Sequence, residues 1–192
     1  MGDDYPANRA DDVRLSQRAV EDDDWIAAFL SRQPTCVLGL VDDGSPYVVN
    51  QLFVYDPAEH AIFLHGANTG RTRTIVERGD SPDASLTVSR MGRLLPAAMP
   101  VDFDVEYASV VVDGEIGLVE DPAKKRLALE RIMEKFAPHM RPGEDYDPIA
   151  DSSIERTSVY RIDVDGWSAK RNEKPPDFDG AYDYETVHDE DG

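Results

Sequence analysis

The sequence contains a single cysteine, Cys36, in 192 residues. One cysteine cannot form an internal disulfide, and it excludes a metal site built from several cysteine ligands. Because Cys36 lies in an apolar run, we expect a buried and unreactive thiol in a reducing cytoplasm. The histidines are scattered along the chain, so we predict no metal site. They are His60, His65, His139 and His188.

Long hydrophobic runs are also missing. No apolar stretch approaches the about 20 residues that a membrane-spanning helix needs, and the chain begins without a signal-peptide pattern. We therefore expect a cytoplasmic protein with no membrane partner. With 192 residues and a hydrophobic content of 41%, the chain suits one domain. A domain of this size buries about 70% of its unfolded surface.

Positive charge is scarce, and lysine is the scarcest charged residue. The chain has 26 Asp and 13 Glu against 15 Arg and 5 Lys, which gives a net charge of −19. Nucleic acids and anionic membranes are poor partners for such a chain. Abundant aspartate with little lysine is similar to the cytoplasmic proteins of salt-loving organisms, so we predict a halophilic protein. The alternative is an acidic protein from an ordinary cell.

The halophilic interpretation predicts that the melting temperature rises strongly between low and molar KCl. At about 1 M salt the Debye length is roughly 3 Å, so crowded surface carboxylates repel one another little. Thermal unfolding followed by circular dichroism in a series of KCl concentrations measures the effect. A melting temperature that stays constant across the series would remove the halophilic interpretation.

Hydrophobic periodicity and turn residues predict a mainly β fold with flanking helices. The expected strands cover residues 35–41, 47–55, 61–64, 84–90, 105–113, 114–120 and 157–164. Helices are expected over residues 16–32 and from Pro122 up to Pro138, with another that ends at Arg78. About seven strands in mostly hairpin order favour an antiparallel sheet that closes into a barrel.

The chain reads as one folded domain with two polar ends. We expect a flexible acidic N-terminus over residues 1–15, a folded domain over residues 16–171 and an acidic tail over residues 172–192. Residues 91–100 are expected to form a loop that carries apolar side chains. Apolar loops of this length cover either a ligand pocket or a subunit interface, and both interpretations stay open.

Residues 62–78 have the densest phosphate-binding chemistry in the chain. A strand leads into a turn with Gly66, Asn68 and Gly70, and the turn leads into a helix. Free amides and the helix dipole attract anions at a helix N-terminus, and arginine adds charge-assisted bonds to phosphate oxygens. The helix start carries hydroxyl and guanidinium groups, from Thr69, Thr72, Thr74, Arg71 and Arg73.

These residues therefore predict a phosphate site. The stretch lacks the lysine and the spacing of a Walker loop, and it is not a GxGxxG motif. In so acidic a chain, the alternative is that both arginines form ion pairs with aspartate or glutamate.

Several short motifs occur in a characteristic order. They are Trp25-Ile26-x-x-Phe29-Leu30, Thr35-Cys36-Val37-Leu38-Gly39, Gly44-Ser45-Pro46-Tyr47-Val48-Val49, Phe63-Leu64-His65-Gly66-Ala67 with Gly70-Arg71, and Tyr107-x-Ser109-Val110-Val111-x-x-Gly114. Together they resemble the pyridoxamine 5′-phosphate oxidase-like family of FMN-binding split barrels over roughly residues 20–171. The pieces at His65 and Tyr107 most resemble its nitroimidazole-resistance (Nim-type) branch.

The resemblance implies a homodimer with two FMN sites at the subunit interface. It places the FMN phosphate at Thr69, Arg71, Thr72 and Arg73, in agreement with the local chemistry. The isoalloxazine ring would lie along Tyr47, Val48, Val49 and Asn50 and along the backbone of His65, Gly66 and Ala67. Further contacts would come from Tyr107, Ser109, Trp167 and Lys170, which the second subunit could supply.

The resemblance also implies His65 as a catalytic residue. The alternative is a histidine at a strand end whose hydrogen bonds go to the backbone. The chain departs from the true oxidases at its C-terminus, where an acidic tail follows Arg171 in place of an arginine-rich segment. Oxidation of pyridoxamine phosphate is therefore not expected.

The expected function is an FMN-dependent oxidoreductase. It would reduce a small electron-poor substrate, such as a nitro compound, with electrons from a nicotinamide donor, while the flavin does the redox chemistry. A deazaflavin-dependent reductase and a non-enzymatic flavin or haem binding protein are the alternatives. The remaining alternative is a barrel whose cleft binds no cofactor.

Overall fold

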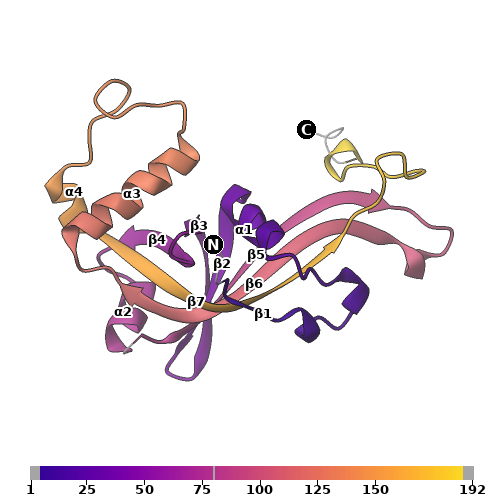
Figure 1. The fold of residues 1–192 in the computed structure, drawn as a ribbon, viewed down its shortest axis with the longest axis horizontal. Helices are drawn as coiled ribbons and strands as arrows, with labels where there is room; N and C mark the ends of the chain where they lie inside the picture. Colours follow the sequence, from indigo (N-terminus) through magenta and orange to yellow (C-terminus); the bar gives the residue numbers. More distant parts are fainter. Residues whose placement is uncertain (1–4, 80, 188–192) are drawn as a thin grey trace.

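The structure, a computed structural model, describes residues 5–79 and 81–187. The strands are β1 (Ala7–Asn8), β2 (Thr35–Asp42), β3 (Ser45–Asp56), β4 (Ala61–Ala67), β5 (Asp83–Leu95), β6 (Asp104–Leu118) and β7 (Thr157–Asn172). The α-helices are α1 (Asp23–Arg32), α2 (Arg71–Arg78), α3 (Pro122–Phe136) and α4 (Asp151–Arg156). These elements confirm the prediction of a mainly β fold with flanking helices (Figure 1).

The strands form one sheet in the order β1-β7-β4-β3-β2-β5-β6, and β6 also pairs with β7. Every pairing is antiparallel except that of β1 with β7. The sheet is not the closed barrel that the sequence predicts, because β2 and β5 are paired only where Val37, Leu38 and Gly39 face residues 85–87. This is the architecture of a split barrel.

The main core lies inside this curved sheet and is closed on one side by α1. Alternate positions of the strands point inward, as period-2 patterning predicts. The largest fully buried side chains come from the strands and from α1: Trp167, Phe53, Ile26, Leu30, Leu38, Ile62, Leu64, Leu86, Ile116 and Ile162. Cys36 is also buried, and burial raises the pKa of its thiol to about 12, as expected for an unreactive cysteine.

The helices cover the sheet at fixed points. Asp22 accepts a hydrogen bond from the amide of Trp25 at 3.0 Å, so α1 begins at Asp23 and not at residue 16 as expected. From α3, Arg131 forms an ion pair with the buried Asp56 at the end of β3. None of the helices within residues 5–79 and 81–187 has both the length and the apolar character that crossing a bilayer requires.

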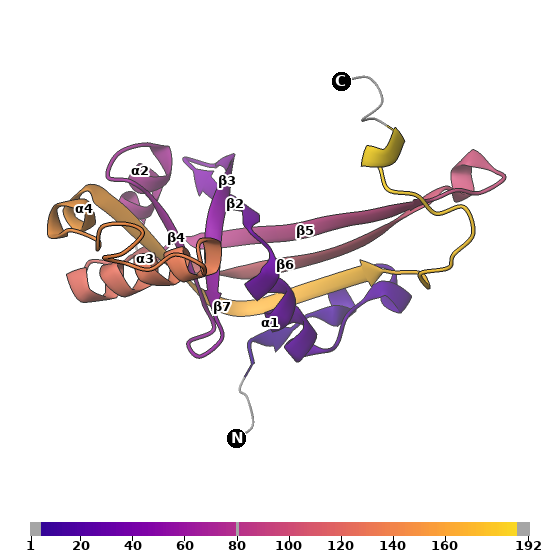
Figure 2. The same ribbon diagram turned by 90° about the horizontal axis from the view of Figure 1, so that it is seen from above.

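Two sequence predictions near the middle of the chain are wrong. Half of the expected loop at residues 91–100 is strand, because β5 continues to Leu95, and the two strands expected over residues 105–120 are the single strand β6. Cross-strand pairing between β5 and β6 outweighs the turn propensity of Gly92, which sits at a register shift. The resulting hairpin projects beyond the barrel as a long arm (Figure 2).

Gly114 was expected to begin a new strand, but it lies at an irregularity inside the β6–β7 pairing. A side chain at this position would collide with the carbonyl oxygen of Asp163 on β7. Glycine therefore permits the close approach of two continuous strands here, and it does not end one of them.

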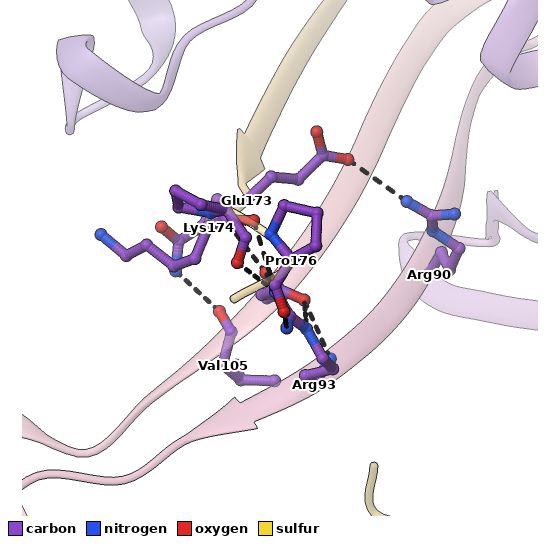
Figure 3. Close-up of polar contacts among 9 residues, drawn as sticks. Arg90, Arg93, Val105, Glu173, Lys174 and Pro176 are labelled. Atoms are coloured by element: carbon purple, nitrogen blue, oxygen red, sulfur yellow. Dashed lines mark hydrogen bonds and ion pairs between the residues drawn. The ribbon is translucent and has the colours of Figure 1, made fainter. Parts of the chain in front are cut away.

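The segment that follows β7 is fastened to the β5–β6 arm. Arg93 forms two bonds to Glu106, of 2.9 and 2.7 Å, and also donates to the carbonyl oxygens of Lys174, Pro175 and Pro176 (Figure 3). The guanidinium of Arg93 holds the pKa of the Glu106 carboxyl at about 2. Residues 174–176, which belong to the segment expected to form an acidic tail, thus have defined partners.

Candidate functional site

The N-terminus of α2 presents unpaired backbone amides. Gly70 adopts φ 112° and precedes the helix, and none of the described side chains caps the first turn. The first intrahelical bond of this turn runs from the amide of Thr74 to the carbonyl of Gly70, at 3.0 Å. The amides of Arg71, Thr72 and Arg73 precede it and lack intrahelical acceptors. A Cβ built on Gly70 would have no heavy atom within 4 Å, so the space before the helix is open.

Tyr47 on β3 contacts the first turn of α2. Its hydroxyl lies 3.1 Å from the hydroxyl of Thr72, and the guanidinium of Arg71 stacks over its ring at 4.7 Å. Three of the predicted cofactor contacts, from two elements, are therefore neighbours. Thr69 is exposed in the turn just before them.

Both predicted phosphate-binding arginines carry ion pairs, as the alternative interpretation expected. Arg71 bonds Asp42 through Nε at 2.7 Å, and Arg73 bonds Glu77 at 2.6 Å. Arg78 pairs with the same Asp42 carboxylate from the other end of α2. Hydrogen bonds from Arg71 and Arg78 lower the pKa of the Asp42 carboxyl, and the bond from Arg71 has the larger effect. The side chain of Arg71 is 51% exposed, whereas that of Arg73 is 25% exposed.

Arg73 belongs to a more buried polar network. Its Nη1 donates to the hydroxyl of Ser158 at 3.0 Å, and that hydroxyl donates to Asn68 Oδ1 at 3.0 Å. The Nε of Arg73 is buried and has no hydrogen-bond partner among the described residues. Buried donors without partners are uncommon in folded proteins, so this atom points to a missing acceptor.

His65 lies at the end of β4, next to the turn. Its Nδ1 is the other buried side-chain atom without a partner among the described residues. The alternative, a strand-end histidine whose hydrogen bonds go to the backbone, therefore does not hold for Nδ1. Burial lowers the pKa of His65, which favours the neutral imidazole. Gly66 and Ala67 follow His65 and pair with Ser158 and Thr157 of β7.

The predicted contacts on β3 alternate between two faces. Tyr47 and Val49 point toward the interior of the barrel, whereas Val48 and Asn50 are exposed on the outer face. Val48 is 68% exposed, and together with Tyr47 it borders an open cavity of about 480 Å³ that residues of β2, β3, β5, β6 and β7 line. This cavity therefore brings together Tyr47 and Val48 of the predicted contacts, but not Val49 or Asn50.

Tyr107, Ser109 and Lys170 form a second group, far from α2. His65 pairs with Val159 near the start of β7, whereas Ser109 pairs with Lys170 near its end. These two β7 positions are 11 residues apart (170 − 159). At about 3.3 Å per residue, the two groups are separated by roughly 35 Å along the strand. The second group lines a separate cavity of about 320 Å³.

Trp167 is not available to a ligand. Its side chain is fully buried, its indole Nε1 donates to Asp23 at 2.9 Å, and its ring packs against Tyr5, Tyr55 and His60. The structure therefore assigns this residue to the core, and we correct its predicted place among the cofactor contacts.

Sequence reasoning missed two residues beside the predicted site. Ser158 holds the Arg73 guanidinium, and Asp42 holds that of Arg71. Both lie far from α2 in the sequence and are brought to it by strand pairing. A serine at the start of a strand and an aspartate in a hairpin turn carry no local signal of this role.

The sequence matches a protein-family model. The model described as "Pyridoxamine 5'-phosphate oxidase" covers residues 22–171. A search of curated protein sequences found no significant match.

Solved structures share the fold. The flavocytochrome Anf3 from Azotobacter vinelandii is 24% identical, with a TM-score of 0.72 over 94% of this chain and 78% of that one. An FAD and heme binding protein from Mycobacterium smegmatis is 18% identical, with a TM-score of 0.71 over 91% and 80% of the two chains. A candidate 5-nitroimidazole antibiotic resistance protein from Bacteroides thetaiotaomicron is 22% identical, with a TM-score of 0.65 over 81% and 90%. At these identities the likeness concerns the fold.

Proposed function

Because this chain belongs to the pyridoxamine 5′-phosphate oxidase family, we propose that it binds FMN with the phosphate at the N-terminus of α2. The observation that carries the proposal is the uncapped start of this helix beside the unpartnered Nε of Arg73. Phosphate oxygens are acceptors that suit both the free amides and this buried donor. Two proteins with the same fold are described as binding FAD, which supports a flavin ligand.

The ion pairs of Arg71 and Arg73 do not oppose phosphate binding. Exposed ion pairs contribute about 0–1 kcal/mol each, whereas a hydrogen bond to a charged group contributes about 1.5–3 kcal/mol. A doubly charged phosphate can therefore replace Asp42 and Glu77 as the partner of these guanidinium groups. Arg73 is the stronger contributor, because Ser158 fixes it and it is less exposed.

The flavin, when bound, supplies hydride and electron transfer. The chain supplies orientation through the backbone of β3 and through the end of β4. His65 would contribute a neutral imidazole whose Nδ1 is free to bond a polar edge of the ring, and it is the residue we assign to catalysis. Asn50 and Val48 on the outer face of β3 would meet the same ligand only from that face.

The complete site requires a homodimer in this proposal. Tyr107, Ser109 and Lys170 lie too far along β7 to reach a cofactor at α2 of their own subunit, so the partner's copy would supply any such contact. Apolar side chains that a second subunit could bury are exposed on β2, β3 and β6. They are Val37, Val41, Val48, Leu52 and Val111.

We infer an oxidoreductase that reduces a small electron-poor substrate, such as a nitro compound, with a nicotinamide donor in the cytoplasm. The acidic residues after Arg171 argue against pyridoxamine phosphate as the substrate, because they would repel its phosphate group. The fold that the chain shares with a candidate 5-nitroimidazole resistance protein is compatible with a nitro substrate.

The absorbance spectrum of the protein as purified, in molar salt, tests this function. We expect the bands of oxidised flavin, their loss when a nicotinamide donor is added in the absence of air, and their return when a nitro compound is then added. A flavin that no nicotinamide donor reduces would contradict the enzymatic proposal and leave a flavin-binding protein.

Haem is a second candidate ligand, because two proteins of the same fold are described as a flavocytochrome and as a heme binding protein. A Soret band in the same spectrum would identify it. A deazaflavin would give a spectrum distinct from both, and a colourless protein in molar salt would contradict all three ligands.

A further inference from the structure

The α3–α4 loop, residues 137–150, is a long connection that lies outside the helices and strands. Loops of this length are uncommon in a folded domain and usually have a function of their own. Together with α3, this loop is at the end of the molecule opposite the β5–β6 arm (Figure 1). None of the residues assigned to the flavin lies in α3 or in this loop, so the proposed function does not account for it.

Hydrogen bonds give the α3–α4 loop a defined shape. In its middle, the amide of Gly143 donates to Tyr146 O at 2.7 Å. Near its end, Arg126 of α3 donates to the carbonyl of Ile149 and pairs with Asp151 at 2.6 Å. The loop is therefore fastened to the helix, as expected for the wall of a preformed pocket.

A cavity of about 480 Å³ lies between the α3–α4 loop and α3. This volume is within the range of small-molecule pockets, which are mostly apolar with a few polar groups that orient the ligand. The apolar and aromatic part of its wall includes Met133, Met140, Pro142, Tyr146, Pro148 and Ile149. The charged residues of the lining are Arg126, Glu130 and Glu134.

The cavity uses the face of α3 that points away from the barrel. Ala128 and Ile132, one turn apart, are buried, and Ala128 packs in a cluster with side chains of β4 and β7. Glu130, Met133 and Glu134 are on the opposite side of the helix at 3.6 residues per turn. One face of α3 thus holds the helix on the barrel, and the other lines the cavity.

The two carboxylates of this lining are brought together by the helix. Glu130 and Glu134 are four residues apart, so their Cβ atoms are about 5–6 Å apart, and like charges at this spacing destabilise a helix. In the part of the chain that the structure describes, neither side chain has an ion pair or a hydrogen bond. A cation in the cavity would relieve this repulsion.

The neighbouring cations are bound to other groups. Arg126 and Arg131 of α3 both pair with aspartates outside this pair of carboxylates. Lys135 donates to the backbone of β3 at 2.9 Å. On the loop, Arg141 pairs with Glu144. The protein therefore leaves the charge of the cavity wall to be neutralised by a ligand.

We propose that this cavity binds a small organic cation, with its ammonium group at Glu130 and Glu134 and its alkyl or aryl body against the loop. Two carboxylates select a positive charge, and an inorganic cation would leave the apolar wall without a contact. The ring of Tyr146 adds an aromatic surface of the kind that attracts ammonium groups. The site is independent of the proposed function, because it shares no residue with the flavin site.

Calorimetric titration of the full-length protein with hexylammonium chloride and, separately, with 1-hexanol tests the proposal, at the lowest salt that keeps the protein folded. We expect saturable binding of hexylammonium, at least about tenfold tighter than that of the uncharged alcohol. Glu130→Gln/Glu134→Gln should weaken hexylammonium binding at least about tenfold and leave hexanol binding unchanged. Met140→Ser should weaken the binding of both probes about threefold, because it removes part of the apolar wall.

Glu21→Gln/Glu115→Gln is the matched control, since it removes two exposed carboxylates outside the cavity and changes the net charge equally. It should leave hexylammonium binding unchanged, and an equal loss in this control would assign the effect to net charge and overturn the site. Equal hexylammonium affinities in wild type and the Glu130/Glu134 variant would also overturn it. So would the absence of saturable hexylammonium binding, and binding of pentalysine in its place would assign the cavity to a basic protein partner. Because neither probe reports on flavin, these results are separate from the outcome of the flavin spectrum.

Discussion

The double variant Arg71→Ala/Arg73→Ala should purify colourless while remaining folded. The wild type should purify yellow under the same conditions. Each guanidinium that is removed costs a bond of about 1.5–3 kcal/mol to the phosphate. Part of this cost is offset, because in the wild type the phosphate displaces an ion pair that contributes at most about 1 kcal/mol per arginine. With about 0.5 kcal/mol taken for each ion pair, the net loss for the two arginines is roughly 2–5 kcal/mol, or about one and a half to three and a half decades in FMN affinity.

The two single variants should lose different amounts of FMN affinity. Arg73→Ala should cost more affinity than Arg71→Ala, because Arg73 is bonded to Ser158 and is half as exposed as Arg71 (25% against 51%). Fluorescence titration with FMN in molar salt measures both, since free flavin emission changes on binding.

Arg78→Ala is the matched control for this series. Arg78 lies on the same helix and pairs with Asp42 and Asp43, but it is at the end opposite the proposed phosphate. The Arg78→Ala variant should keep its bound FMN. A double variant of Arg71 and Arg73 with full flavin absorbance would remove both residues from the site, and an equal loss in Arg78→Ala would assign the effect to net charge.

Trp167→Ala should destabilise the fold by about 3–5 kcal/mol. The side chain is fully buried against Tyr5, Tyr55 and His60, so its removal leaves a large cavity in the barrel core. Urea unfolding at one fixed salt concentration, followed by circular dichroism, measures the loss.

Trp167→Phe separates packing from cofactor binding. This variant keeps an aromatic ring but loses the hydrogen bond from the indole to Asp23. Asp23 still accepts a bond of 2.7 Å from Asn8. We therefore expect a smaller loss in the free energy of unfolding, of about 1–2 kcal/mol. The FMN affinity of this folded variant should equal that of the wild type. A large loss of affinity at nearly unchanged stability would restore Trp167 to the cofactor contacts.

Local chemistry was sufficient to predict some parts of this molecule. The glycine-rich turn and the helix that ends at Arg78 follow from residues close together in sequence, and α2 occupies this place. Alternation of apolar residues was enough to predict the strands that form the core.

Long-range pairing decided the parts that sequence reasoning missed. The length of β5 depends on its partner β6, and the attachment of residues 174–176 depends on Arg93, about 80 residues earlier. Likewise, Ser158 reaches Arg73 only because β4 and β7 are neighbours. No short window of sequence contains both members of such a pair.

The comparison of FMN with riboflavin tests the central claim most directly, because riboflavin differs from FMN only by lacking the phosphate. If α2 holds the phosphate, wild-type protein should bind FMN at least about a hundredfold more tightly than riboflavin. The Arg71→Ala/Arg73→Ala variant should reduce this ratio to about tenfold or less, through weaker FMN binding alone. Equal affinities of the wild type for the two flavins would contradict the account.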